Sequence, residues 1–379
     1  MYLDYGGFAP VDPRVLAVMT PFLEGWVGNP SAPHALGHEA RDSLAGARAK
    51  IGRLVGGRPE GVIFTSGATE ANNLAIRGVG LRGPGRHVLT TGIEHVSVLT
   101  PCRDLVKAGF RVTFLPVDGE GRLAPECVRA ALTPDTCLVS IGAANAEVGT
   151  VQPWRAIAAV TQAAGVPLHV DGVGAVGRIP LSVEADGIDL LTVAANDLYG
   201  PPGVGALWVR PGIRLNPQLL GGGQEAGLRS GTENLAGVAG LGVAAEVATR
   251  DGTLEAGRLA ALRDRLIEGL AIGCPSARLT GAHHDRLPHH VSVAIPGVKG
   301  ESLVMALDLV GISAATGSAC TALTREPSHV LRALGFEGRA AEGSLCVTLG
   351  RWTRAEDVQV FLSELPPIVD RLRAASPFA

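Results

Sequence analysis

Short apolar runs alternate with segments of helical periodicity between residues 60 and 210, and this alternation constrains the fold more than any other feature. Runs such as GVIFTSG, RHVLTTGI and GIDLLTVAA consist largely of apolar and β-branched residues, and segments such as ANNLAIRGV and WRAIAAVTQAAG separate them. Apolar strands separated by helices are typical of a mostly parallel sheet covered on both faces. Because ligands bind beyond the carboxyl ends of the strands in such sheets, we expect the functional site at that edge.

The pattern changes near residue 250. The stretch GTLEAGRLAALRDRLIEGLA has the periodicity of a long amphipathic helix, and the strand-like segments HHVSVAIPG and SLCVTLG follow it among further helical segments. A chain of 379 residues is long enough for two or three domains at roughly 100–200 residues each. The sequence therefore predicts a large α/β domain followed by a smaller α+β domain.

Composition narrows the partners and the compartment. The formal net charge of −3 argues against nucleic acids and anionic membranes as partners. The six cysteines are scattered without a CxxC pair, which favours reduced thiols in a cytoplasm. The chain shows no signal peptide and no apolar run of roughly 18 residues, and the histidines of AHHDRLPHH match no common zinc pattern. We therefore expect a cytoplasmic protein that binds neither nucleic acid, membrane nor metal.

Candidate ligand-binding residues directly follow several of the strand-like runs. In TSGATEANNLA a helix opens at Ala68 and Thr69, so the free amides there suit a phosphate, although an ordinary helix cap has the same pattern. Asp171 would hold a protonated ring nitrogen or cap a helix. His95 would stack on a flat ring or serve as a structural group, and Asn145 supplies a neutral hydrogen-bonding group.

Three loops carry further polar or reactive side chains. GGGQEAGLRSGTEN (residues 221–234) contains Thr232 and would wrap a phosphate or support a subunit contact. ATGSACTALTREPS (residues 315–328) places Cys320 among small residues, a setting typical of an accessible thiol, although an incidental cysteine in a linker is the alternative. AANDLYGPPGVG (residues 194–205) lies between two apolar runs and predicts a stiff turn that presents Asp197 in a fixed place.

Together these segments resemble the cysteine desulfurases of the NifS and IscS type, in the class V aminotransferase superfamily of fold-type I enzymes that use pyridoxal phosphate (PLP). FTSGATEANNLAIRG and TGSACT…EPSHVLRALG are the most specific pieces, and the similarity runs nearly end to end. The resemblance implies a large domain (residues 16–250) with a mostly parallel seven-stranded sheet. It also implies a small α+β domain (residues 251–379) that carries Cys320, and an N-terminal segment (residues 1–15) associated with that small domain.

The resemblance also assigns a role in cofactor binding to each strand-end residue. Thr69 and the neighbouring amide of Ala68 would bind the PLP phosphate. His95 would stack on the pyridine ring, and Asn145 would lie beside the ring substituents. Asp171 would pair with the ring nitrogen.

Two more roles involve other molecules. The resemblance implies a homodimer in which Thr232 reaches the PLP phosphate of the partner subunit. Cys320 would be the nucleophile that takes sulfur from L-cysteine as a persulfide. It would pass that sulfur to an iron–sulfur scaffold or another sulfur-acceptor protein.

The chain departs from the family pattern at the centre of the site. Asp197 stands where the family keeps its Schiff-base lysine, and a carboxylate cannot form that bond. Ala194 and Asn196 stand at two phosphate-binding positions, and Cys346 stands where an arginine grips the substrate carboxylate. By the family pattern, none of the three lysines lies in the pocket. We therefore expect PLP binding to be weak or absent, and never through a lysine Schiff base.

Three functions stay open. In the first, the chain is a pseudoenzyme that has lost the PLP reaction and keeps Cys320 for persulfide transfer or iron–sulfur cluster assembly. In the second, it is an active desulfurase that holds PLP weakly and noncovalently, with Asp197 as the catalytic base. In the third, it is a noncatalytic binding partner of itself or of a true desulfurase.

Overall fold

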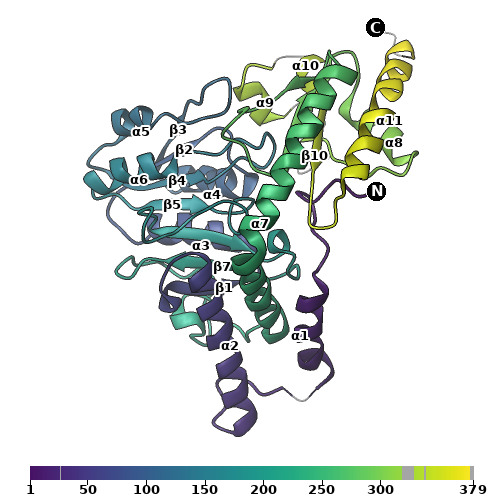
Figure 1. The fold of residues 1–379 in the computed structure, drawn as a ribbon. Coiled ribbons are helices and arrows are strands. Elements are labelled where there is room, and N and C mark those ends of the chain that lie inside the picture. Colours follow the sequence, from purple (N-terminus) through teal and green to yellow (C-terminus); the bar gives the residue numbers. More distant parts are fainter. Residues whose placement is uncertain (26, 318–327, 337–338, 376–379) are drawn as a thin grey trace.

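A seven-stranded sheet forms the centre of the computed structural model, which describes residues 1–25, 27–317, 328–336 and 339–375 (Figure 1). The strand order is β1-β7-β6-β5-β4-β2-β3. Neighbouring strands in the series β6-β5-β4-β2-β3 pair in parallel. Strand β7 runs antiparallel to both of its neighbours, β1 and β6. This sheet confirms the predicted fold class. The strands are β1 (Val62–Thr65), β2 (His87–Thr91), β3 (Arg111–Leu115), β4 (Thr136–Gly142), β5 (Leu168–Asp171), β6 (Leu190–Ala194) and β7 (Gly205–Val209).

Alternate residues of the strands face two separate apolar cores, as the two-residue period of a strand requires. Phe64 and Leu191 belong to one core, while their chain neighbours Ile63 and Leu190 belong to the other. Both faces of the sheet are therefore buried, which explains the continuous apolar runs in the sequence. The helices of this part are α1 (Pro13–Glu24), α2 (Ala35–Leu54), α3 (Ala68–Gly80), α4 (Val96–Lys107), α5 (Pro125–Ala131) and α6 (Trp154–Ala163), with short 3-10 turns η1 (Pro59–Gly61), η2 (Asn196–Leu198) and η3 (Glu225–Gly227).

Helices α1 and α2 precede the alternating pattern and were not predicted from it. Asp12 caps α1 by accepting a hydrogen bond from the Arg14 backbone N–H, and Pro13 occupies the first helical position. In α2, the buried residues Leu44, Ala47 and Ile51 recur at helical spacing and pack into the first core. The local signals for both helices were therefore present in the sequence.

A single long helix, α7 (Leu235–Gly273), leads from the sheet to a third apolar core that includes Leu266, Val293, Leu345 and Phe361. Figure 1 shows α7 running from α2 at one end to α11 at the other, and it contacts both. The domain boundary predicted at residue 250 falls inside this helix. None of the described helices, α7 included, has the length and apolarity to cross a membrane. The remaining elements are β8 (Arg278–Leu279), α8 (Gly300–Asp308), β9 (His290–Ala294), α9 (His329–Ala333), α10 (Arg339–Glu342), β10 (Ser344–Thr348) and α11 (Ala355–Ala374).

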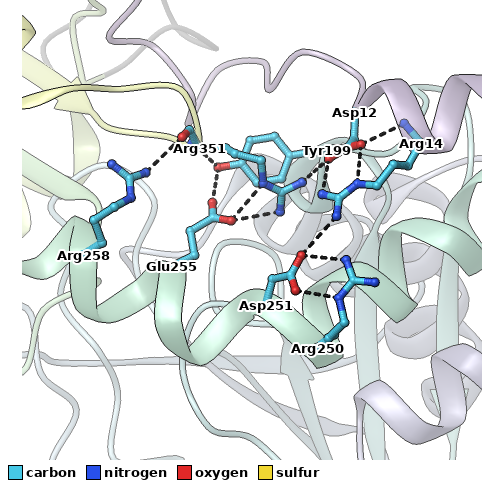
Figure 2. A network of polar contacts seen from close by, with 8 residues as sticks. All are labelled: Asp12, Arg14, Tyr199, Arg250, Asp251, Glu255, Arg258 and Arg351. Atoms are coloured by element: carbon cyan, nitrogen blue, oxygen red, sulfur yellow. Dashed lines mark hydrogen bonds and ion pairs between the residues drawn. The ribbon is translucent and has the colours of Figure 1, made fainter.

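A network of charged side chains holds the turn between β6 and β7 against the segment after β10 (Figure 2). The Tyr199 hydroxyl donates to Glu255 Oε1 at 2.8 Å and accepts from the Arg351 backbone N–H at 2.9 Å. The Arg351 guanidinium lies 4.1 Å from the centroid of the Tyr199 ring and pairs with Glu255 and Asp12. Asp12 also pairs with Arg14 at 2.7 Å. The network joins the N-terminal segment, the β6–β7 turn, α7 and the segment after β10.

We predict that Asp12→Asn lowers the free energy of unfolding by about 2 kcal/mol at pH 7. Asp12 is 3% exposed, and its replacement leaves Arg351 with one carboxylate partner fewer. Urea denaturation followed by circular dichroism measures the loss. Asp251→Asn is the matched control, because Asp251 pairs with Arg14 and Arg250 but its side chain is 36% exposed. That control should cost less than about 1 kcal/mol.

The difference in stability between the wild type and Asp12→Asn should depend on pH in a defined way. The Arg14 guanidinium, assisted by Arg351, holds the pKa of Asp12 well below its ordinary value. A carboxylate with a depressed folded-state pKa contributes its full stabilisation above the ordinary value of about 3.9 and loses it as the pH falls further. The stability gap between wild type and Asp12→Asn should therefore be full at pH 7 and smaller at pH 3. A gap that is constant or wider at pH 3 would contradict this assignment.

Candidate functional site

The carboxyl ends of β1, β2, β4 and β5 surround a pocket of about 580 Å³, a volume that includes its open mouth. Four of the residues predicted from strand ends line it, namely Ala68, His95, Asn145 and Asp171. The other lining residues are Ile93, Glu94, Ser97, Gly142, Ala144, Ala146, Gln152 and Val173. The site therefore lies at the edge of the sheet where the parallel strands end.

Asp171 is the last residue of β5, and its buried carboxylate forms part of the pocket wall. It accepts hydrogen bonds from Asn72 Nδ2 at 2.7 Å and from the Val173 backbone N–H at 3.1 Å. Burial raises the pKa of Asp171, while these hydrogen bonds and His95 act in the opposite direction. Asn72 also donates to Ser97 Oγ at 2.8 Å. The Asn72 amide thus fixes the carboxylate and ties α3 to α4.

His95 caps the N-terminus of α4 and exposes its ring at the pocket. The ring is oriented by Ser97, whose backbone N–H donates to His95 Nδ1 at 3.1 Å and whose hydroxyl lies 2.7 Å from the same atom. The neighbouring Glu94 is buried and accepts from Thr91 Oγ1 at 2.6 Å and from the Gly142 backbone N–H at 2.8 Å. Burial raises the pKa of Glu94 to about 7.

The Asn145 side chain is largely engaged in hydrogen bonds within the protein. Its Nδ2 donates to the Ile93 carbonyl at 2.7 Å, and its Oδ1 accepts from the backbone N–H groups of Glu147 and Val148. The side chain therefore stabilises the turn after β4, and its Oδ1 is already used twice. Only part of its hydrogen-bonding capacity is left for a ligand.

Ala68 and Thr69 form the first turn of α3, and only Ala68 is among the residues that line the pocket. Glu70 in the same turn accepts from the Ser66 backbone N–H at 2.8 Å and pairs with Arg229 at 3.0 Å. Like Thr69, Thr232 is exposed and is absent from the pocket lining; it lies in the segment before α7. Its predicted reach to a partner subunit stays a prediction.

Asp197 lies in η2, in the turn that follows β6, and its side chain is only 12% exposed. It accepts from Asn196 Nδ2 at 3.0 Å and pairs with Arg178 at 3.4 Å. Burial raises the pKa of Asp197, and Arg178 opposes that rise. Both Asp197 and Arg178 line a second, smaller pocket of about 360 Å³ between the turn and α7. Asn196 is thus engaged with its neighbour and is absent from the lining of the strand-end pocket.

All three lysines of the chain lie among the described residues, and none of them lines the strand-end pocket. Lys50 on α2 pairs with Glu246 on α7 at 2.6 Å. Lys107 ends α4, and Lys299 precedes α8 in the second domain. The pocket thus offers a buried carboxylate and an imidazole ring, which suit a pyridine ring, but no amine for a Schiff base. These residues do not fit PLP as a lysine-bound cofactor.

Cys346 lies on β10 in surroundings that do not favour a bound carboxylate. Its Sγ is 3.3 Å from His290 Nε2, and that nitrogen also lies 2.8 Å from the Ala146 carbonyl. Burial raises the pKa of the Cys346 thiol and lowers the pKa of His290 to about 3, so both groups are uncharged at neutral pH. Arg286 is buried nearby, and its guanidinium donates to the carbonyls of Ala282 and Val148.

The residue predicted as the sulfur nucleophile, Cys320, falls outside the described residues. Three residues that shape the described site were not predicted from the sequence: Asn72, Glu94 and Arg178. Glu94 directly precedes a predicted site residue, and Arg178 lies seven residues beyond Asp171. A largely buried acid requires a compensating cation, and this requirement was not used to predict an arginine near Asp197 from the sequence.

Comparison with known proteins shows the family of the chain. Residues 1–361 match the family described as aminotransferase class-V. Cysteine desulfurase IscS 1 of Archaeoglobus fulgidus is 46% identical over 378 residues, covering 99% of this chain and 98% of that protein. Cysteine desulfurase IscS of Dictyoglomus turgidum is 42% identical over 380 residues, and the match covers 100% of this chain and 96% of that protein. A solved NifS-like protein superimposes with a TM-score of 0.92 at 34% identity, over 98% of this chain and 100% of that one. The chain therefore belongs to the aminotransferase class-V family, among the cysteine desulfurases of the IscS and NifS type.

Proposed function

We propose that this desulfurase homologue has lost lysine-dependent PLP chemistry and that Cys320 acts as a sulfur carrier. One observation carries the proposal, namely the largely buried Asp197 carboxylate bonded to Arg178 and Asn196 where the family resemblance places a lysine. A carboxylate has no nitrogen that could attack an aldehyde, so it cannot anchor the cofactor covalently. The negative charge of Asp197 also disfavours a dianionic phosphate group nearby.

The surroundings of Cys346 support the same proposal. An amino-acid substrate needs a cation for its carboxylate, and the uncharged pair of Cys346 and His290 supplies none. The amine that would bind PLP covalently and the cation that would bind the substrate carboxylate would thus both be missing. Loss of a single residue by chance would not produce this combination.

The sulfur-carrier role uses chemistry that needs no PLP. The Cys320 thiolate would attack the outer sulfur of a persulfide on a donor molecule. The new bond forms between Cys320 Sγ and that sulfur, the sulfur–sulfur bond of the donor breaks, and the donor leaves as a thiolate. The step has no net oxidation or reduction. An iron–sulfur scaffold or another sulfur-acceptor protein would take the sulfur onward, and we propose that the chain acts as a cytoplasmic homodimer.

The first test of this proposed function concerns the covalent attachment of PLP to the protein. We expect no borohydride-stable PLP adduct on the wild-type protein, as measured by absorption near ~400 nm and by peptide mass analysis, because no lysine lines the pocket. The matched variant Asp197→Lys returns an amine to the turn and should give an adduct at residue 197. A wild-type adduct on a lysine, formed at one equivalent of PLP, would defeat the proposal.

The second test of this proposed function concerns sulfur transfer to Cys320. After incubation with glutathione persulfide, the peptide that contains Cys320 should carry one additional sulfur atom, and Cys320→Ala should abolish that signal. Cys127→Ala is the control, because Cys127 is a partly buried thiol on α5, outside the residues that line the strand-end pocket. Equal labelling of the wild type and Cys320→Ala would rule out a carrier role for Cys320.

An active desulfurase with noncovalent PLP is the second candidate. It is favoured because one pocket holds both Asp171, fixed by Asn72, and the His95 ring, oriented by Ser97. Alanine formation from L-cysteine with added PLP distinguishes the two functions. We expect no alanine above the background of free PLP. If alanine forms and Asp197→Asn reduces it at least about a hundredfold, Asp197 is a catalytic base and the second candidate replaces the first.

A further inference from the structure

A groove beside α7 lies apart from the strand-end pocket and shares none of its described lining residues. One wall is the part of α7 between Ala248 and Ala256, and the other consists of residues 176–181 together with Leu54 of α2. The groove has a volume of about 720 Å³, which includes its open mouth. We call it the α7 groove.

Two glycines allow the walls of the α7 groove to approach each other closely. Gly177 has a φ of +75°, and a Cβ atom there would lie 2.6 Å from Leu198 Cδ2 and 3.0 Å from Ala248 Cβ. A Cβ atom at Gly252 would lie 2.6 Å from the Gly177 carbonyl oxygen. The segment that carries Arg178 is therefore held directly against α7.

Arg178 is the one charged residue among the described residues that line the α7 groove. Its side chain is only 9% exposed. Leu54, Ile179 and Leu181 line the same groove, and they are partly buried against the first core. A guanidinium in such apolar surroundings has little water to solvate it, so the groove favours a ligand with one negative charge and an apolar body.

One edge of the Arg178 guanidinium is available to a ligand. In the described part of the chain, its hydrogen bonding is limited to Nη1, which donates to Asp197 Oδ1 at 3.4 Å. The donors Nε and Nη2, which form the adjacent edge, have no acceptor among those residues. In Arg14 the same edge holds a carboxylate at two points, because Nε and Nη2 donate to the oxygens of Asp12 at 2.9 and 2.7 Å. The unused edge of Arg178 therefore matches a carboxylate.

We propose that the α7 groove binds a small aliphatic monocarboxylate as a free molecule. Its carboxylate accepts from Nε and Nη2 of Arg178, while Nη1 keeps its contact with Asp197, and its apolar chain packs on Leu54 and Ile179. A doubly charged phosphate would leave one charge without a counter-charge in the groove. The inference is independent of the proposed function, because it involves neither PLP nor Cys320.

Four probes test this chemistry by isothermal titration at pH 7.5. Hexanoate should bind saturably, and at least about tenfold more tightly than acetate, which lacks the apolar chain, or 1-hexanol, which lacks the charge. Hexyl phosphate should also bind more weakly than hexanoate. Equal or tighter binding of any of these three probes overturns the inference. So does the absence of saturable hexanoate binding up to roughly 10 mM.

A pair of matched variants locates the hexanoate on Arg178. Arg178→Lys keeps the positive charge but removes the two-point edge, so it should weaken hexanoate at least about fivefold. Arg210→Lys is the control, because Arg210 forms a similar pair with Asp189 at 2.8 Å but does not line the α7 groove. Its hexanoate affinity should equal that of the wild type. Equal affinities of the two variants would contradict the proposed contact.

A second pair of variants separates ligand binding from support of the turn after β6. Asp197→Asn removes the counter-charge and keeps Arg178, so hexanoate should bind as tightly as to the wild type or more tightly. The double variant Arg178→Gln/Asp197→Asn leaves no unpaired charge in the turn and should bind hexanoate at least about tenfold more weakly than Asp197→Asn. Equal weakening in both would show that the turn, and not the guanidinium, determines binding, and it would overturn the inference.

Discussion

Because apolar side chains cover both faces of the seven-stranded sheet, polar groups concentrate where the strands end. An uncompensated polar group in either core would cost several kcal/mol, on the order of 2–7. The ends of β2, β4 and β5 therefore bring His95, Asn145 and Asp171 to one pocket, although up to 76 residues of sequence separate them. The remaining chemistry of the site depends on this placement.

Two aspartates in this region, Asp171 (buried) and Asp197 (largely buried), are stabilised in different ways. Asp171 accepts hydrogen bonds from a neutral amide and a backbone N–H, which leaves its charge available to a ligand. Asp197 is paired with a guanidinium, and its charge is partly used within the protein. A buried acid without such a partner would destabilise the fold strongly, so Arg178 makes an aspartate tolerable in the turn after β6.

The strands and most helices could be predicted because their signals are local. Apolar runs indicated β1 to β7, and helical periodicity indicated α3 to α6. Helices α1 and α2 had caps and apolar stripes as well, but they lie outside the alternating pattern. Pairings across the chain were not predictable in the same way: Asn72 meets Asp171 across 99 positions, and no periodicity reports such a contact. The pairing of Cys346 with His290 depends likewise on the register between β9 and β10.

Helix α7 has a mechanical consequence. Its 39 residues span about 58 Å, and its two ends pack against α2 and α11 in different cores. A hinge between the two cores would have to break the hydrogen-bond ladder of a continuous helix, so the helix acts as a stiff strut. Tyr199 and Arg351 meet beside Glu255 near the middle of this strut, so their contacts link the helix to the β6–β7 turn and to the segment after β10.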